Sequence, residues 1–415
     1  MNKKRPELLA PAGDMLRLKC AVRSGADAVY LGGTMFGMRT APANFTNEQL
    51  EEAVEYAHGN GVKVYLTANV LPRNHELSEL PRFLERAKSA GTDALIISDI
   101  GVLEAAKKYA PGVDIHVSTQ HGVVNWLSAN ALYSMGARRI VAARELSLEE
   151  IAQIRKNVPP DLEIEAFVHG AMCVSFSGRC LLSNYLTGRD SNRGECAQPC
   201  RWKYHLMEET RDGQFFPVDE DESGTYLFNS RDMCMIEHIP ELVQAGVNSF
   251  KIEGRAKSEY YVSTITNAYR MAIDAYLASP SDDFKPESWL VDEVYKVSYR
   301  DYCTGFYFDD PSQNANISPY GGYKRPWEVA AVVEKCEGGR VFCTQRNRFF
   351  EGEVLEAAII GERPVTVIAK GLRNSEGESI ESTNHAMMEF SFECDSAFEA
   401  GTFLRRQRTA EEQQQ

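Results

Sequence analysis

The segment Gly25-Ala26-Asp27-Ala28-Val29-Tyr30-Leu31-Gly32 joins a tight turn to a short apolar strand, and it decides the fold that the sequence predicts. The phrase returns as Gly91-Thr92-Asp93-Ala94 and, more loosely, as Gly136-Ala137-Arg138-Arg139. Each copy supplies the end of a helix and a turn into the next strand. Helices that alternate with strands in this way indicate a parallel sheet with helical crossovers.

Eight segments carry the pattern of such strands. They are predicted at Glu7–Ala10, Ala28–Gly32, Lys63–Asn69, Ala94–Asp99, Asp114–Gln120, Arg139–Ala143, Glu163–His169 and Val247–Ile252. Between them we expect amphipathic helices, such as Asn47–His58, which begins with a capping box of Thr46 and Gln49. Eight units favour an α/β fold with a TIM-barrel-like (β/α)8 domain. An open doubly wound sheet is the alternative, and the absence of G-x-G-x-x-G after the first strand counts against it.

A chain of 415 residues exceeds the usual size of one domain, so a second, smaller domain is expected. The barrel domain is predicted over residues 1–313, with a cysteine-rich insertion at about 170–230, and residues 314–326 form a linker. Residues 327–407 alternate apolar and polar side chains and are expected to form a small β-barrel domain, and residues 408–415 a disordered tail. Its strands are predicted at Val329–Val333, Val341–Gln345, Thr366–Ala369 and Glu389–Phe392.

Composition limits the class of protein. No apolar run reaches the roughly 20 residues that span a bilayer, and no signal peptide is recognisable, so we expect a cytoplasmic protein without membrane contact. Cytoplasmic thiols stay reduced, so clustered members of the ten cysteines point to metal or redox chemistry rather than to disulfides. The net charge of −14 weighs against non-specific nucleic-acid binding, although it leaves room for a local basic patch.

Four cysteines stand close together in the insertion, namely Cys173, Cys180, Cys196 and Cys200. The Gly and Ser residues between them let the chain wrap, so their thiols can converge on one metal centre. Zinc and a [4Fe–4S] cluster both accept four thiolates. Structural zinc usually prefers two closely spaced pairs, and only Cys196 and Cys200 have that form, so the wider first pair favours a cluster. Zinc and unliganded thiols are the alternatives.

Polar residues also gather at the predicted C-terminal strand ends, where TIM-barrel active sites form. Lys251, Glu253 and Arg255 alternate along the end of the eighth strand, and such a group suits a carboxylate or phosphate. His169 ends the seventh strand, and we include it with these three as a candidate catalytic residue. The alternatives are a structural histidine and a structural network of ion pairs. Candidates for substrate binding are Asn69, Asp99, Gln120, Glu145, Arg179 and Tyr260.

Four stretches resemble the collagenase-like peptidase family U32, namely Glu7–Gly13, Gly25–Gly32, Cys173–Tyr204 and Lys251–Arg255. The resemblance covers essentially the whole chain. Members carry two kinds of label, collagenase-like protease and oxygen-independent hydroxylation protein, the latter for tRNA, 23S rRNA or a ubiquinone ring precursor. The resemblance implies that the cysteine positions above bind a [4Fe–4S] cluster and that RNA-directed members depend on prephenate.

The length and the appended β domain are most similar to the tRNA branch, which implies 5-hydroxylation of the wobble uridine. Lys251 and Arg255 would then hold prephenate, a dicarboxylate, near the cluster. The β domain would help to hold the tRNA through a local patch such as Arg405-Arg406. Such a patch is needed because residues 327–410 carry ten Lys and Arg against fourteen Asp and Glu.

Three other functions stay open. A collagen-degrading peptidase is disfavoured by the missing signal peptide and by the absence of H-E-x-x-H and G-x-S-x-G motifs. A cluster-binding hydroxylation protein could act on another RNA or ring substrate. The chain could also support another enzyme as a subunit, in a homo-oligomer or in a hetero-oligomer with a paralogue.

Overall fold

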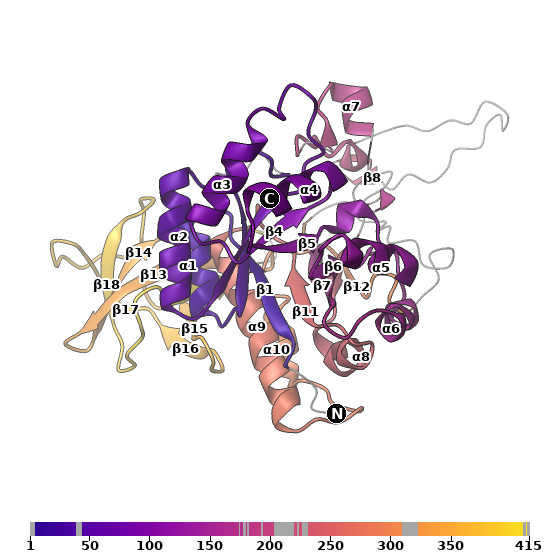
Figure 1. Ribbon diagram of the computed structural model, residues 1–415. Helices are drawn as coiled ribbons and strands as arrows, with labels where there is room; N and C mark the ends of the chain where they lie inside the picture. The colour runs from indigo at the N-terminus through magenta and orange to yellow at the C-terminus, as the bar shows by residue number, and fades with distance from the viewer. Residues whose placement is uncertain are drawn as a thin grey trace, which may run out of the picture.

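A computed structural model describes residues 5–38, 44–173, 175–176, 180, 182–191, 194–202, 220–221, 224–225, 231–308, 323–409 and 412. Strands and helices alternate through the first part of the chain, and a separate domain of strands follows (Figure 1). In the part of the chain that is described, no helix is both long and apolar enough to cross a membrane.

Eight parallel strands close into a barrel. Strands β1 to β7 pair in chain order, and β11 pairs with both β1 and β7, which completes the ring. The strands are β1 (Glu7–Pro11), β2 (Ala28–Gly32), β3 (Lys63–Ala68), β4 (Ala94–Ile97), β5 (Asp114–Val117), β6 (Arg139–Val141), β7 (Glu163–Ala171) and β11 (Ser249–Ile252). Each overlaps a segment predicted from the sequence. The (β/α)8 barrel is therefore confirmed, and the open doubly wound sheet is excluded.

Helices cover the outside of this barrel (Figure 1). They are α1 (Met15–Arg23), α2 (Asn47–Gly59), α3 (Leu80–Ser89), α4 (Ile100–Tyr109), α5 (Trp126–Ser134), α6 (Leu148–Asn157), α8 (Ile239–Gln244), α9 (Glu259–Ala278) and α10 (Ser288–Glu293). The predicted capping box is present at the start of α2, where Thr46 and Gln49 each bond the other's main chain. The apolar faces of the helices pack on the outer side chains of the strands and form the main core.

Charged side chains fill the N-terminal end of the barrel interior. Arg139 lies 2.6 Å from Glu7, 2.6 Å from Glu163 and 3.1 Å from Glu165, measured between nitrogen and oxygen atoms. Burial alone would raise the pKa of Glu7, but the Arg139 guanidinium holds it below its usual value. Because Glu7, Arg139 and Glu163 each begin a strand, this network closes the end of the barrel opposite the catalytic face.

The insertion begins and ends beside β7. After Ala171 the chain leaves the barrel, and it returns as β10 (Asp232–Cys234), which pairs antiparallel with β7 so that Asp232 lies opposite Ala171. Strand β12 (Tyr302–Cys303) then pairs with β10. The described parts of the insertion include α7 (Leu182–Thr187), the 3-10 turn η4 (Pro199–Arg201), β8 (Glu220–Asp221) and β9 (Gly224–Thr225). The cysteine-rich insertion thus stands at the C-terminal end of a barrel strand, as predicted.

The C-terminal domain is a seven-stranded antiparallel sheet in the order β16-β15-β19-β13-β14-β18-β17. Its strands are β13 (Trp327–Glu337), β14 (Arg340–Gln345), β15 (Val354–Ala358), β16 (Val365–Ile368), β17 (Lys370–Asn374), β18 (Glu389–Glu393) and β19 (Phe403–Gln407). The sheet forms a half-barrel around a separate apolar core that includes Phe349, Phe390 and Phe392. The predicted β domain is confirmed. Linker residues 314–322 and tail residues 410, 411 and 413–415 lie outside the described residues.

The two domains meet through ion pairs that exclude one sequence-based prediction. Arg405 on β19 is 0% exposed, and its guanidinium lies 2.6 Å from Glu293 of the barrel domain and 3.0 Å from Glu356. Arg406 lies 2.6 Å from Glu328 and 2.7 Å from Glu412. The prediction of Arg405-Arg406 as an RNA-binding patch is therefore wrong, because carboxylates already occupy both guanidinium groups.

Candidate functional site

The cysteines predicted to bind a metal lie at the catalytic face of the barrel. Cys173 comes two residues after the end of β7, Cys200 lies in η4, and none of the four forms a disulfide. The residue Cys173 is exposed overall, but partial burial of its thiol group raises the pKa of that thiol. The charges of Cys180 and Cys196 add smaller contributions that raise the same pKa.

Main-chain N–H groups point at two of these sulfurs. The Leu182 amide donates to Cys180 Sγ at 3.4 Å, and the Gln198 amide donates to Cys196 Sγ at 3.3 Å. Gln198 reaches this position with a φ of +56°, in the left-handed region. Both amides direct the positive end of an N–H dipole at a sulfur atom. Such bonds to sulfur also tune iron–sulfur clusters.

The donor set of the insertion is compatible with two kinds of metal centre. Its four cysteine thiols are free, and zinc and a [4Fe–4S] cluster both accept four thiolates. Among the described residues, no three ligating side chains are placed to hold a metal ion. The kind of metal centre therefore stays a prediction.

Arg144 is a site residue that the sequence interpretation missed. It follows β6, its guanidinium lies 3.8 Å from the centroid of the Phe167 ring, and it donates to the Ala171 carbonyl at 3.0 Å. Its positive charge lowers the pKa of Cys173, which places it beside the cysteines. Its Nε atom is buried without a hydrogen-bond partner among the described residues. Arg144 thus offers a positive charge to an anion at the mouth, and its position after a barrel strand was the signal that could have found it.

Lys251 and Glu253 gather around Tyr30, next to the Phe167 ring that Arg144 contacts, whose centre lies 5.4 Å from Lys251 Nζ. Lys251 Nζ donates to Glu165 at 2.7 Å and lies 4.6 Å from the centre of the Tyr30 ring. The Tyr30 hydroxyl lies within hydrogen-bond distance of both the Ile252 carbonyl and the Glu253 carboxylate, at 3.0 and 3.1 Å. The charge of Lys251 is therefore balanced by Glu165 inside the barrel, which leaves it less suited to an external anion than the sequence suggested.

Arg255 turns back across the ends of β2 and β3. Its guanidinium donates to Asn44 at 2.7 Å and contacts the Thr67 hydroxyl at 3.4 Å. Gly32 makes this possible, because a Cβ there would lie 2.4 Å from Arg255 Nη2. Lys251, Glu253 and Arg255 are thus brought to the same region, as the sequence predicts, but each already contacts a different neighbour.

His169 is enclosed by tyrosines. The Tyr269 and Tyr302 hydroxyls lie 3.4 and 3.3 Å from its two ring nitrogens, and the residue is 1% exposed. Burial lowers the pKa of His169 to about 3, and the charge of Lys257 adds to the effect. The contacts describe a neutral imidazole packed against α9 rather than one that faces the mouth.

The other candidates have varied surroundings. Asn69 accepts a bond from the Met38 amide, Asp99 caps α4, and the Gln120 side chain accepts from Ser98. Glu145 is half-buried after β6, and Arg179 lies outside the described residues. Tyr260 contacts Arg405 in the domain interface, away from the mouth. Asn69, Asp99 and Gln120 therefore lie at strand ends on the predicted face, where their side chains already bond neighbouring segments of the protein.

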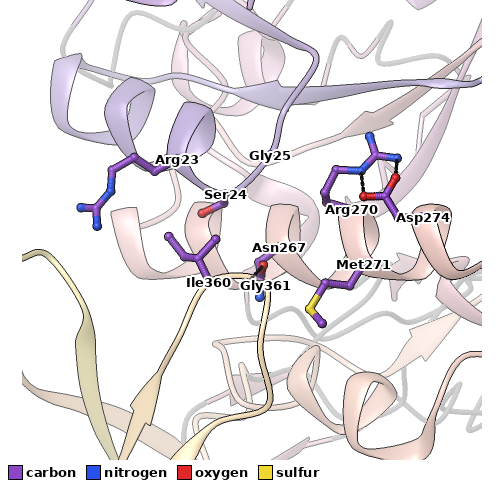
Figure 2. A pocket seen from close by; sticks show the side chains of 9 residues that line it. All are labelled: Arg23, Ser24, Gly25, Asn267, Arg270, Met271, Asp274, Ile360 and Gly361. Carbon is purple, nitrogen blue, oxygen red and sulfur yellow. Dashed lines mark hydrogen bonds and ion pairs between the residues drawn. The ribbon is translucent and has the colours of Figure 1, made fainter. Parts of the chain in front are cut away.

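A cavity of about 320 Å³ lies at the opposite end of the barrel. Its lining includes Ser24 and Gly25 after α1, Arg270 of α9, and Gly361 of the C-terminal domain (Figure 2). Arg270 is bound to Asp274 at 2.7 Å, and the Gly361 amide donates to Asn267 at 2.9 Å. Because Gly25 precedes β2, this cavity marks the seam between the domains and not the catalytic face.

Two family models and several known proteins match this sequence. The sequence model of "Peptidase family U32" matches residues 13–317, and "Peptidase family U32 C-terminal domain" matches residues 325–405. "tRNA hydroxylation protein P1" of Bacillus subtilis is 35% identical over 405 residues, which are 97% of this chain and 95% of the relative. "Uncharacterized protease MJ0090" of Methanocaldococcus jannaschii is 47% identical, with 81% of this chain and 80% of the relative covered. "tRNA hydroxylation protein P" of Escherichia coli is 34% identical, with 91% of both chains covered.

Proposed function

Because the chain belongs to peptidase family U32, and because its clustered cysteines stand at the mouth of the barrel, we propose that it is an RNA-hydroxylating enzyme. The proposed reaction is oxygen-independent 5-hydroxylation of the wobble uridine of tRNA, with prephenate as cosubstrate. The observation that carries the proposal is the likeness to the Bacillus subtilis tRNA hydroxylation protein, which extends over 97% of the chain and so includes both domains. A cytoplasmic location and assembly with a second or paralogous subunit stay predictions.

The cofactor of this proposal is a [4Fe–4S] cluster held by Cys173, Cys180, Cys196 and Cys200. Support comes from the four free thiols and from the two N–H···S bonds. The cluster would supply one-electron redox chemistry at the barrel mouth. Arg144 would offset part of its negative charge, because the guanidinium acts on Cys173.

The cosubstrate of the proposal is a dicarboxylate, and two arginines are placed for it. Arg144 has no carboxylate within 4 Å among the described residues, so it can bind one from outside. Arg255 lies at the ends of β2 and β3, where it donates to Asn44 and Thr67. Lys251 contributes indirectly, because its ion pair with Glu165 fixes Tyr30, and Tyr30 in turn orients Glu253.

Nucleoside analysis of tRNA tests the function. Deleting the gene together with its paralogues is expected to remove the modifications derived from 5-hydroxyuridine at the wobble position, as measured by liquid chromatography and mass spectrometry. Expression of this chain is expected to restore them, and expression of the Cys196→Ser variant is not. The Cys20→Ala variant is the control, because Cys20 lies on α1, outside the cysteine cluster. Unchanged wobble nucleosides in the deletion strain would rule the function out.

Anaerobic purification tests the cofactor separately. The protein is expected to be brown and to contain about four irons per chain, with Cys196→Ser losing most of them. A colourless protein with one zinc would overturn the cluster assignment. That result would not affect the proposed RNA substrate, which the nucleoside analysis tests separately.

A peptidase is the second candidate, and one observation favours it, the 47% identity to the Methanocaldococcus protein named a protease. The contacts of the histidines count against it. His58 pairs with Asp93, His238 pairs with Glu241, and His169 meets two tyrosine hydroxyls. These contacts do not assemble the nucleophile and base of a hydrolase. Collagen cleavage by the purified protein, abolished by a single substitution, would reverse this order.

A further inference from the structure

The C-terminal domain keeps most of its positive charges in ion pairs. Six of its ten basic side chains lie within 4 Å of a carboxylate, at Lys335, Arg340, Arg363, Arg405, Arg406 and Arg408. Of the remaining four, Arg346 and Arg348 lie in the connection between β14 and β15, and Lys370 and Arg373 lie on β17. Within the described residues, none of these four has a carboxylate partner inside 4 Å.

The two arginines of the β14–β15 connection stand beside exposed apolar side chains. The Arg348 guanidinium lies 4.7 Å from the centre of the Phe350 ring, and Arg346 Nη1 lies 3.2 Å from the Met387 sulfur. Phe350 is 46% exposed and Met387 is 61% exposed. We call these four residues the arginine–phenylalanine patch. It combines two cationic groups with a flat ring and a flexible thioether, and the last two are exposed.

The backbone under the patch is held firmly. Arg346 and Asn347 both donate their amides to the Ala330 carbonyl, and the Asn347 side chain donates to Val329 at 2.8 Å. Phe349, between the two exposed positions, is fully buried in the core of the domain. The patch is therefore a fixed surface, and binding to it would require little ordering of the chain.

Nearby acidic groups affect how such a surface can bind. Glu351 directs both carboxylate oxygens at the amides of Gly371 and Leu372, at 2.8 Å each, which leaves it less able to repel a ligand. Glu353 lies 3.8 Å from Arg406. Glu381 and Glu389 are exposed on neighbouring segments and would oppose an anion. Stacking on Phe350 and Arg348 would thus contribute more than bulk attraction of phosphates.

The patch also lies within reach of the barrel mouth. Tyr323 packs on Lys257, with Nζ 4.1 Å from the ring centre, and Lys257 follows Arg255 by two residues. From Tyr323 to Val329, which touches the patch backbone, the chain is six residues long and spans at most about 20 Å. One RNA molecule could therefore enter the mouth and contact the patch.

We propose that the arginine–phenylalanine patch binds a single-stranded or looped part of the RNA substrate outside the barrel mouth, and this rests on the proposed function. An unpaired base stacks on Phe350 or on the Arg348 plane, and Arg346 contacts the adjoining phosphates. Unstacked bases in RNA loops are recognised in this way, on aromatic rings and on arginine planes. The overall negative charge of the domain does not prevent it, because stacking needs no net attraction.

Binding of an unmodified tRNA transcript to the full-length holoprotein tests the proposal, measured by fluorescence anisotropy over a range of salt concentrations. Phe350→Ala is expected to weaken binding by about 5- to 150-fold, the loss found for one stacked base. Arg346→Gln is expected to reduce the slope of log Kd against log salt by about 0.7, the contribution of one phosphate contact to a single strand.

Arg363→Gln is the matched control. Arg363 lies on the same domain and is exposed, but it pairs with Glu287, so its loss removes the same charge without touching the patch. Circular dichroism checks that all variants are folded, and Phe350→Tyr, which keeps the ring, should bind as wild type does. Equal tRNA affinity of the Phe350→Ala variant and wild type would overturn the proposal. A changed oligomeric state in sedimentation, with tRNA affinity intact, would overturn it too and assign the patch to protein contacts. Failure of the wild type to bind any RNA would instead sink the proposed function.

Discussion

Arg144 and Glu145 are neighbours in sequence, but they differ in what they can offer a substrate. Glu145 was predicted from its place after a barrel strand, and Arg144 was passed over. The structure stacks Arg144 on Phe167 beside Cys173, with a buried nitrogen that lacks a partner among the described residues. The sequence could predict that a functional residue follows strand β6, but only the contacts in the structure show that this residue is Arg144.

Substitution of these two neighbours separates their roles. Arg144→Gln is expected to raise the prephenate concentration that gives half-maximal hydroxylation by about 10- to 150-fold, because a hydrogen bond to a charged group contributes about 1.5–3 kcal/mol. Glu145→Gln is the control and is expected to change it by less than about threefold. Steady-state assays on anaerobically purified protein measure both. Equal effects at the two positions would refute the role given to Arg144.

Two adjacent arginines at the start of strand β6 have opposite environments, one exposed and one buried. Successive side chains of a strand face opposite sides. Arg138, just before β6, is 59% exposed and lies 3.8 Å from Asp161, whereas the side chain of Arg139 is 3% exposed and contacts three carboxylates inside the barrel. Two adjacent arginines therefore have very different effects on stability.

Replacing each arginine with Met tests this difference. Arg139→Met is expected to lower the free energy of unfolding by about 3–5 kcal/mol, because it leaves Glu7 buried without its cation, whereas Glu165 keeps Lys251. Arg138→Met is expected to change it by no more than about 0.5 kcal/mol. Urea unfolding followed by circular dichroism gives both values. A small loss for Arg139→Met would mean that water or another cation already satisfies the carboxylates.

Elements with local signals could be predicted, and elements that depend on distant pairing could not. Thr46 and Gln49 form a capping box within four residues, so the start of α2 was predicted correctly. Strands β10 and β12 have three and two residues. They exist because β10 pairs with β7 and β12 pairs with β10, which no local pattern reveals. Strand β19 was missed because Arg405 and Arg406 read as solvated charges, whereas carboxylates of both domains neutralise them.

In the candidate site too, features with a local sequence signal could be predicted, and contacts between distant residues could not. The cysteines were predicted to bind a metal because four thiols close in sequence are a strong local signal, and their role as ligands stays a prediction. Lys251, Glu253 and Arg255 were correctly placed near one another, since alternation along a strand fixes their positions. Their individual partners, such as Glu165 for Lys251, come from strands more than eighty residues away and could not be read from the sequence.

For the whole molecule, buried histidines link stability to pH. Burial lowers the pKa of His169 to about 3 and that of His116 well below its ordinary value. In the unfolded chain both would titrate near pH 6.5. Below that pH the unfolded state binds more protons than the folded state, so the free energy of unfolding falls as pH falls.

Each histidine is expected to contribute a loss of about 2 kcal/mol between pH 7.5 and pH 5, at about 1.4 kcal/mol per unit below pH 6.5. His169→Gln removes one of the two groups and is expected to flatten the dependence by one proton. Urea unfolding at a series of pH values measures the slope. An unchanged slope in the variant would show that His169 is already protonated in the folded protein.

The antiparallel pairing of β10 with β7 also affects how the protein can evolve. Asp232 lies opposite Ala171, so the intervening chain leaves and re-enters the barrel at one place. Closing a loop between fixed ends costs little more as it lengthens, only about 0.6 kcal/mol for each doubling. Insertions and deletions between these ends can therefore accumulate while the strand register of the barrel stays the same. Descendants of one scaffold can in this way diverge toward new substrates by exchanging this segment alone.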